Sequence, residues 1–108
     1  MDFIDIDPLL RDSIDMHMHP GPGGLCRLDA IEAAEQAKKA GMKAIVLKSH
    51  SYTAAAVAIL VNKIVPDFKT FGGVCLDFEV GGLNYHAVQT SAMMGAKVVW
   101  MPTFSSVN

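Results

Sequence analysis

Four short strand patterns alternate with three helical patterns along this chain of 108 residues, and this alternation is what most limits its possible folds. The expected strands lie at residues 13–19, where apolar and polar residues alternate, and at the more apolar stretches 44–47, 70–76 and 97–101. Strands that alternate with helices predict an α/β fold with a parallel sheet and right-handed crossover connections. The expected order of elements is therefore βαβαβαβ.

Capping and breaking residues delimit the three expected helices. Each helix begins at a polar capping residue and ends before a glycine or a proline, which places them between Asp29 and Gly41, between Ser51 or Thr53 and Pro66, and between Asn84 and Gly95. Residues 41–47 also parallel residues 95–101, so a helix-to-strand unit is repeated.

The chain is too short to form a complete (β/α)8 barrel, which needs roughly 250 residues. If strands that follow each other in the sequence are neighbours in the sheet, all three helices cover one face and the other face stays open. We therefore expect one domain over residues 1–108, folded as half of a TIM-like barrel and completed by a partner, a second copy or residues outside this sequence. A doubly wound open sheet, with helices on both faces, is the alternative.

Composition narrows the classes of partner. Hydrophobic residues make up 51% of the chain, the net charge is -2, and the basic residues form no cluster, which argues against nucleic acid or an anionic membrane surface. The acidic N-terminus and the lack of an apolar run of roughly 18 residues predict a cytoplasmic protein. The expected partners are a small-molecule substrate and either a second copy or a complementary half-barrel.

His17 and His19 form the most informative local motif. Side chains two residues apart on a strand point to the same face, about 6.6 Å apart at their Cα atoms, so both rings can bind one metal ion. The same parity puts Asp15 on this side and Ile14, Met16 and Met18 on the other. The alternative is a surface strand with solvated histidines.

Further polar residues follow the next two expected strands, at the edge of the sheet where parallel α/β folds bind ligands. His50 can supply a third imidazole, and three protein ligands plus water are typical of a catalytic metal site. Asp15 is placed to hold and orient the ring of a metal-binding histidine, and Glu79 can add a ligand or act as a general base. Lys48 ends an apolar strand, so it needs a carboxylate partner, a substrate anion or a modification.

Each of these residues also has a structural interpretation. His50 can be a residue at the start of a helix that binds no metal, and Glu79 can be a solvated residue of a loop. For Lys48 the structural interpretation is a salt bridge with Asp15 or Asp77. Its functional roles would be that of a base with a depressed pKa or, after carbamylation, that of a bridge between two metal ions. Trp100 is expected to be a packing residue.

Residues 14–19 resemble the opening motif of the amidohydrolase superfamily and of the polymerase-and-histidinol-phosphatase type of metal hydrolases. Residues 40–50, 71–73, 80–84 and 95–103 extend the likeness to an uncharacterised bacterial family of cytosolic amidohydrolase-like proteins. The resemblance covers nearly the whole chain and corresponds to the N-terminal part of such proteins. It implies that His17 and His19 are metal ligands, and that His50 matches a histidine of the phosphatase-type branch.

Two functions follow as hypotheses. The first is a metal-dependent hydrolase, or its N-terminal half, that uses a divalent ion to cleave an amide, lactone or phosphoester bond of a small molecule. The expected ion is Zn²⁺, and Mn or Fe are the alternatives. The second is a non-catalytic half-barrel that associates with itself or with a partner chain.

Overall fold

The structure is a computed structural model that describes residues 7–22 and 26–102. Its four parallel strands form one sheet in the order β1 (Ile14–Met18), β2 (Ala44–Leu47), β3 (Lys69–Cys75) and β4 (Val98–Trp100). The helices are α1 (Asp7–Leu10), α2 (Ala30–Lys39), α3 (Ala54–Ile64), the short 3-10 helix η1 (Phe78–Val80) and α4 (Tyr85–Met93). The predicted βαβαβαβ order is confirmed, and α1 and η1 are additions to it.

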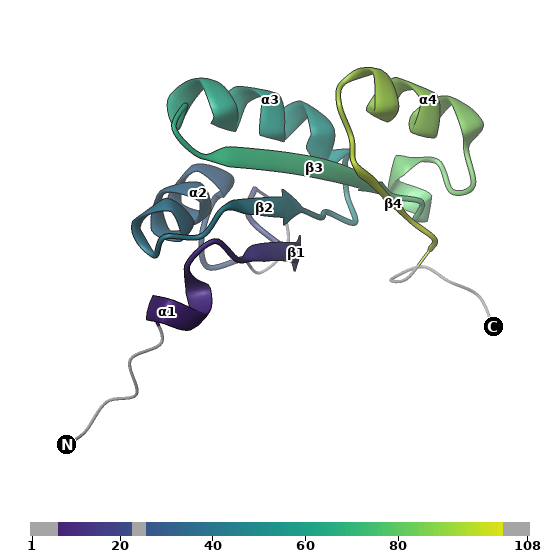
Figure 1. Cartoon of the computed structure of the whole chain (residues 1–108). Coiled ribbons are helices and arrows are strands. Elements are labelled where there is room, and N and C mark those ends of the chain that lie inside the picture. Colours follow the sequence, from purple (N-terminus) through teal and green to yellow (C-terminus); the bar gives the residue numbers. More distant parts are fainter. Residues whose placement is uncertain (1–6, 23–25, 103–108) are drawn as a thin grey trace.

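The fold is an α/β half-barrel. Helices α2, α3 and α4 lie on one side of the curled sheet (Figure 1), and consecutive strands are neighbours throughout. A right-handed crossover between adjacent parallel strands always places its helix on the same face, which explains this one-sided arrangement. The alternative of a doubly wound sheet is therefore wrong, and the fold corresponds to half of a TIM-like barrel.

The helix ends follow the capping residues of the sequence with one exception. Asp29 and Glu32 form a reciprocal capping box at the start of α2, and the Asn84 side chain accepts the backbone N–H of His86 at the start of α4. Thr53 instead shares a hydrogen bond of 2.8 Å with the Ser91 hydroxyl, which ties α3 to α4. Among the described helices, none combines the length and the apolar character needed to cross a membrane.

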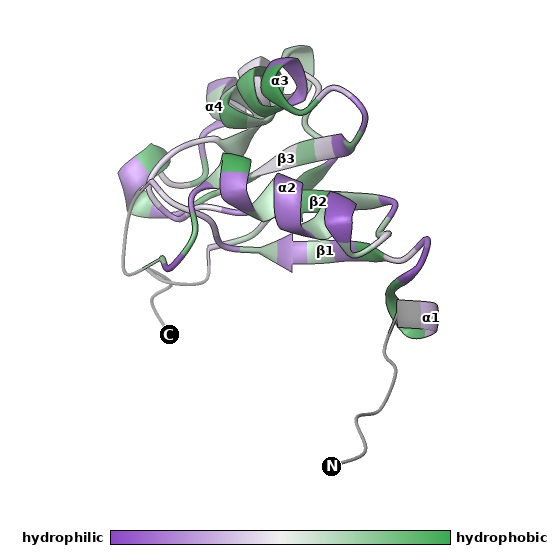
Figure 2. Ribbon diagram, turned by 90° about the vertical axis from the view of Figure 1, so that its left-hand side faces the viewer, coloured by the Kyte–Doolittle hydropathy of each residue, from purple (hydrophilic) through white to green (hydrophobic). Residues whose placement is uncertain are grey.

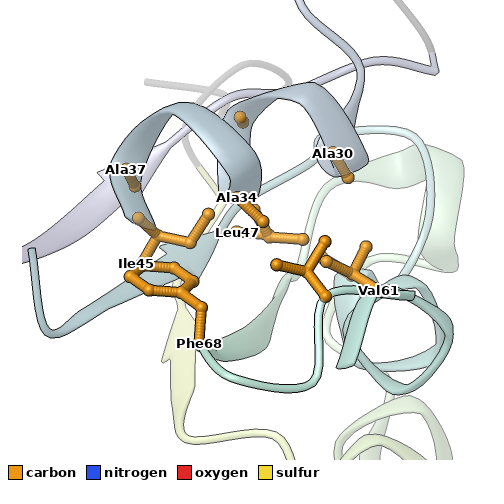
Figure 3. Packing of buried hydrophobic residues seen from close by; sticks show 10 residues of the cluster. Ala30, Ala34, Ala37, Ile45, Leu47, Val61 and Phe68 are labelled. Carbon is orange, nitrogen blue, oxygen red and sulfur yellow. The ribbon is translucent and has the colours of Figure 1, made fainter. Parts of the chain in front are cut away.

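The core lies between the sheet and its helices. Ile45 and Leu47 of β2 are buried beneath Ala34 and Ala37 of α2, and Val61 of α3 packs beside them (Figure 3). Alanines on the inner side of α2 let this helix approach the sheet closely, and the buried apolar area stabilises the layer.

The register of β1 differs from the predicted alternation. Asp15 pairs with Ile45 and Met18 pairs with Leu47, so β1 advances three residues while β2 advances two. The extra residue in β1 shifts the alternation, because two residues of a bulged strand oppose one of its partner. Asp15 and Met18 therefore both lie on the helix side of the sheet, where Met18 packs against the core. The prediction that Asp15 shares a face with His17 and His19 is wrong.

Candidate metal centre

The candidate site lies on the face of the sheet opposite the helices. Gly72 faces α3, since a Cβ added there would lie 2.3 Å from the Ala54 carbonyl oxygen. The next residue, Gly73, faces the other way, and a Cβ there would lie 2.4 Å from Trp100 Cζ3. The Trp100 indole therefore lies across β3 on the open face, and the His17 ring is its neighbour, with 5.9 Å between the ring centroids.

His17 and His19 converge at the end of β1 as the sequence predicted. Their Nε2 atoms lie 2.8 Å apart and their ring centroids 4.8 Å apart, and both side chains are exposed. The carboxyl end of β1 is correspondingly hydrophilic, in contrast to the apolar β2 beside it (Figure 2). The two rings thus face each other through their Nε2 atoms, at the distance of a hydrogen bond.

His50 joins this pair from the segment after β2. Its ring stacks on the His19 ring with a centroid distance of 5.1 Å and an interplanar angle of 22°. We refer to His17, His19 and His50 as the histidine cluster. Residues from the ends of two neighbouring strands are therefore brought to one rim of the half-barrel.

Asp77 anchors His50 from the end of β3. The Asp77 carboxylate is 0% exposed and accepts a hydrogen bond of 2.6 Å from His50 Nδ1. It also accepts the Cys75 thiol at a distance of 3.0 Å. A carboxylate that holds one ring nitrogen fixes both the tautomer and the orientation of a histidine, which is the usual arrangement around metal-binding histidines. Asp77 therefore has the orienting position that was predicted for Asp15.

Two overlapping sets of side chains offer ligand atoms for a divalent ion here. One is the histidine cluster, whose imidazoles suit zinc and similar metals and in which the Nε2 atoms of His17 and His19 lie 2.8 Å apart. The other consists of His50, Cys75 and Asp77, whose ligand atoms all lie within 4.8 Å of one another. The sets differ in character, because only the second contains a thiol.

Lys48 and Trp100 lie beside the histidine cluster. The Lys48 side chain is only 4% exposed, and its Nζ lies 5.1 Å from the centroid of the Trp100 ring. Burial of an ammonium group is costly unless charge or π-electron density compensates it. Trp100 thus contributes to the site, whereas the sequence predicted only a packing role.

The environment lowers the pKa of His19 below its ordinary value of 6.5. Partial burial is the main cause, because it disfavours the charged imidazolium. Positive charge on His17, His50 and Lys48 acts in the same direction. The neutral imidazole, which is the form that binds metals, is therefore favoured at His19.

Asp15 and Glu79 lie apart from this group. The Asp15 carboxylate accepts the backbone N–H of His17 at 3.0 Å and lines a pocket beside Ala37 of α2. Glu79 is exposed in η1 and lines another pocket between the start of α3 and α4. The predicted contact of Asp15 with a histidine ring is replaced by this backbone contact, because the extra residue in β1 turns Asp15 toward α2.

The sequence interpretation missed Cys75 and underrated Asp77, which it considered only as a partner of Lys48. A signal was present, because Cys75 and Asp77 are two residues apart at the end of an expected strand, as His17 and His19 are. The position of Trp100 depends on Gly73, whose missing side chain leaves room for the indole.

Comparison with known families gives one result. Residues 12–108 match a family of unknown function, DUF6282, whereas neither a curated protein nor a solved structure matches the chain. The match includes every strand of the half-barrel and every residue of the histidine cluster. The chain therefore belongs to the DUF6282 family.

Proposed function

We propose that this chain is a metal-dependent hydrolase, or the N-terminal half of one, that acts on an amide, lactone or phosphoester bond of a small molecule. The observation that carries the proposal is the convergence of His17, His19 and His50 at the carboxyl end of the sheet. This is the edge at which (β/α)8 enzymes place their active sites. The resemblance of residues 14–19 to the opening motif of amidohydrolases supports the same conclusion.

The spacing of His17 and His19 can be compared with the spacing that a divalent ion requires. Two nitrogens that bind Zn²⁺ at about 2.0–2.1 Å in tetrahedral geometry lie about 3.3–3.4 Å apart. The observed separation of 2.8 Å between the Nε2 atoms of His17 and His19 is shorter, and it is the distance of a hydrogen bond between the two rings. Binding of an ion between them would replace this hydrogen bond and requires both rings to rotate apart.

Asp77 prepares His50 for the same ion. Because the carboxylate accepts the Nδ1 proton, the lone pair of the neutral ring lies on Nε2, the nitrogen available for coordination. We propose Zn²⁺ as the first choice, with Mn or Fe as alternatives, since imidazole suits all three. A divalent ion in such a site acts as a Lewis acid and lowers the pKa of a coordinated water to about 7.

We further propose that the protein acts in the cytoplasm. Both cysteines, Cys26 and Cys75, are free thiols, and Cys75 is fully buried. Free thiols are typical of a reducing compartment.

Lys48 lies at the rim of the half-barrel that carries the histidine cluster, and we propose it as the candidate group for contact with the substrate.

Metal analysis of the purified protein tests the proposal. The wild-type chain is expected to bind close to one equivalent of Zn²⁺, and His17→Gln combined with His19→Gln is expected to lose it. His86→Gln is the matched control, because His86 is an exposed histidine of α4 outside the histidine cluster. Equal metal content in the double variant and the wild type would rule the site out.

Cobalt substitution separates the two ligand sets. If the histidine cluster holds the ion, the Co²⁺ protein lacks a thiolate-to-cobalt charge-transfer band, and Cys75→Ser leaves its spectrum unchanged. If His50, Cys75 and Asp77 hold it, that band is present and Cys75→Ser removes it. Cys26→Ser is the control for general effects of removing a thiol.

A specific observation also favours the second hypothesis, self-association of the half-barrel. Large apolar side chains of both outer strands are exposed, including Ile14 at 47% and Met16 at 54% on β1 and Val99 at 46% on β4. Outer strands with free backbone groups and exposed apolar side chains favour pairing with another chain. Association and catalysis are compatible, since a barrel assembled from two halves would enclose the histidine cluster.

A further inference from the structure

A side-chain hydrogen bond joins the segment after β1 to the segment after β2, close to the histidine cluster. The Tyr52 hydroxyl donates to the Pro22 carbonyl oxygen at a distance of 2.6 Å, although the two residues are 30 positions apart in the sequence. Pro22 follows His19 by three residues, and Tyr52 follows His50 by two. We refer to this hydrogen bond as the tyrosine link. It connects the two segments that carry these histidines.

Two links between the segments enclose the two histidines. The first is the backbone hydrogen bond of 2.8 Å from the Lys48 N–H to the Met18 carbonyl oxygen, at the end of the pairing between β1 and β2. His19 directly follows this bond along one segment, and His50 follows it along the other. The tyrosine link lies beyond both of them. A segment that is held on both sides of a residue has fewer conformations than one held on one side only, so both histidine backbones are restrained.

Each side of the tyrosine link is itself anchored. Gly21, the neighbour of Pro22, donates its N–H to the Leu28 carbonyl oxygen at 2.7 Å. It also accepts the N–H of Ala30, the first residue of α2, at 3.0 Å. The Tyr52 ring is half-buried and packs against the hydrophobic core. The tyrosine link therefore joins two anchored parts of the structure.

From this arrangement we infer that Tyr52 is a positioning residue of the metal centre, which holds the segments of His19 and His50 together and keeps their rings stacked. The stacked rings have a centroid distance of 5.1 Å. The inference rests on the proposed function and adds a residue to the same site. Ligands that are held in place before the ion binds avoid part of the entropy cost of ordering them. Tyr52 acts on the histidines through the two backbone segments.

Tyr52→Phe tests the inference, because it removes the hydroxyl and keeps the aromatic ring. In the metal-free wild type, NMR cross-peaks between the ring protons of His19 and His50 are expected, and they should weaken in the variant. The affinity for Zn²⁺, measured by competition with a chromophoric chelator, should fall by about two- to tenfold, which corresponds to the loss of one hydrogen bond. Tyr85→Phe is the matched control, since Tyr85 is an exposed tyrosine at the start of α4.

The two measurements distinguish a positioning role from a structural one. A tyrosine that only stabilised the fold would affect the free energy of unfolding, but would leave the cross-peaks and the Zn²⁺ affinity of the folded protein unchanged. That result for Tyr52→Phe overturns the inference and leaves the metal site in place. A wild-type chain that binds no Zn²⁺ overturns the proposed function, and the cross-peaks of the metal-free protein then decide the inference alone.

Circular dichroism establishes whether Tyr52→Phe is folded. If it is not, Pro22→Gly replaces it in both measurements, because glycine at this exposed position frees the backbone that carries the acceptor oxygen. Weaker cross-peaks in Pro22→Gly support the inference, and unchanged cross-peaks overturn it.

Discussion

Asp77 is the residue on which the geometry of the histidine cluster most depends. It is fully buried and it orients His50 through a hydrogen bond of 2.6 Å. We expect Asp77→Asn to weaken Zn²⁺ binding by about 10- to 100-fold. An amide oxygen accepts the hydrogen bond from His50 Nδ1 less strongly than a carboxylate does, and an amide does not restrict His50 to one tautomer. Competition with a chromophoric chelator measures this change. Asp67→Asn is the control, since Asp67 is an exposed partner of Lys38, and unaltered affinity in Asp77→Asn would contradict the orienting role.

His19 gives a prediction about pH at the same scale. Its pKa is lowered in the folded state, so between this pKa and 6.5 the unfolded chain binds more protons than the folded chain. The free energy of unfolding of the metal-free protein should therefore decrease as the pH falls from 6.5 through the folded pKa.

An NMR titration of the imidazole protons should give His19 a pKa below 6.5. His17→Gln should raise that pKa in part, because burial remains as the main cause. The explanation fails if His19 titrates at or above 6.5 in the metal-free wild type.

The contact between β3 and α3 shows how closely the elements of this fold approach one another. At Gly72 a side chain would overlap the backbone of the first turn of α3, 2.3 Å from the Ala54 carbonyl oxygen. We expect Gly72→Ala to lower the free energy of unfolding by about 1–3 kcal/mol, since strand or helix must move. Urea denaturation measures the difference. Gly21→Ala should have a much smaller effect, because its nearest contact would be 3.4 Å, and equal stabilities of the two variants would contradict this account.

Thr70 of β3 gives a second prediction for the packing between these elements. Its hydroxyl is buried, and no hydrogen-bond partner for it is found among the described residues, although Asn62 of α3 binds its backbone N–H and carbonyl. Thr70→Val removes the unsatisfied hydroxyl, and we expect thermal unfolding to show a gain of up to about 1 kcal/mol. Thr53→Val should be destabilising instead, because it removes the bond to Ser91. A loss of stability in Thr70→Val would indicate that the hydroxyl has a partner.

At the scale of the whole molecule, the half-barrel leaves one face of its sheet and two outer strands without a cover from the described residues. Parallel sheets are normally covered on both faces, so we expect the isolated chain to associate. Light scattering at micromolar concentration should give a dimer or a larger species, and Val99→Lys on β4 should shift it toward the monomer. A wild-type chain that stays monomeric at these concentrations would contradict this expectation.

The fold could be predicted from the sequence because its signals are local. Apolar stretches, capping residues and glycines determine where strands and helices begin and end, and short alternating elements leave few topologies once crossovers are right-handed. The same periodicity of two correctly placed His17 and His19 on one face. The contribution of His50 could also be anticipated, because residues after parallel strands gather at one edge of the sheet.

The tertiary structure alone decided which side chains surround the histidines, because this depends on strand register and on contacts between segments. The extra residue of β1 turns Asp15 toward α2, and no local pattern reveals a bulge whose position depends on pairing with β2. The roles of Asp77 and Cys75 arise because β3 ends beside the segment that carries His50, and Trp100 reaches the site only because Gly73 gives it room. The sequence by itself thus determined the half-barrel and its pair of histidines, since these follow from short-range periodicity. The partners of those histidines were decided by distances between strands, which only the folded chain defines.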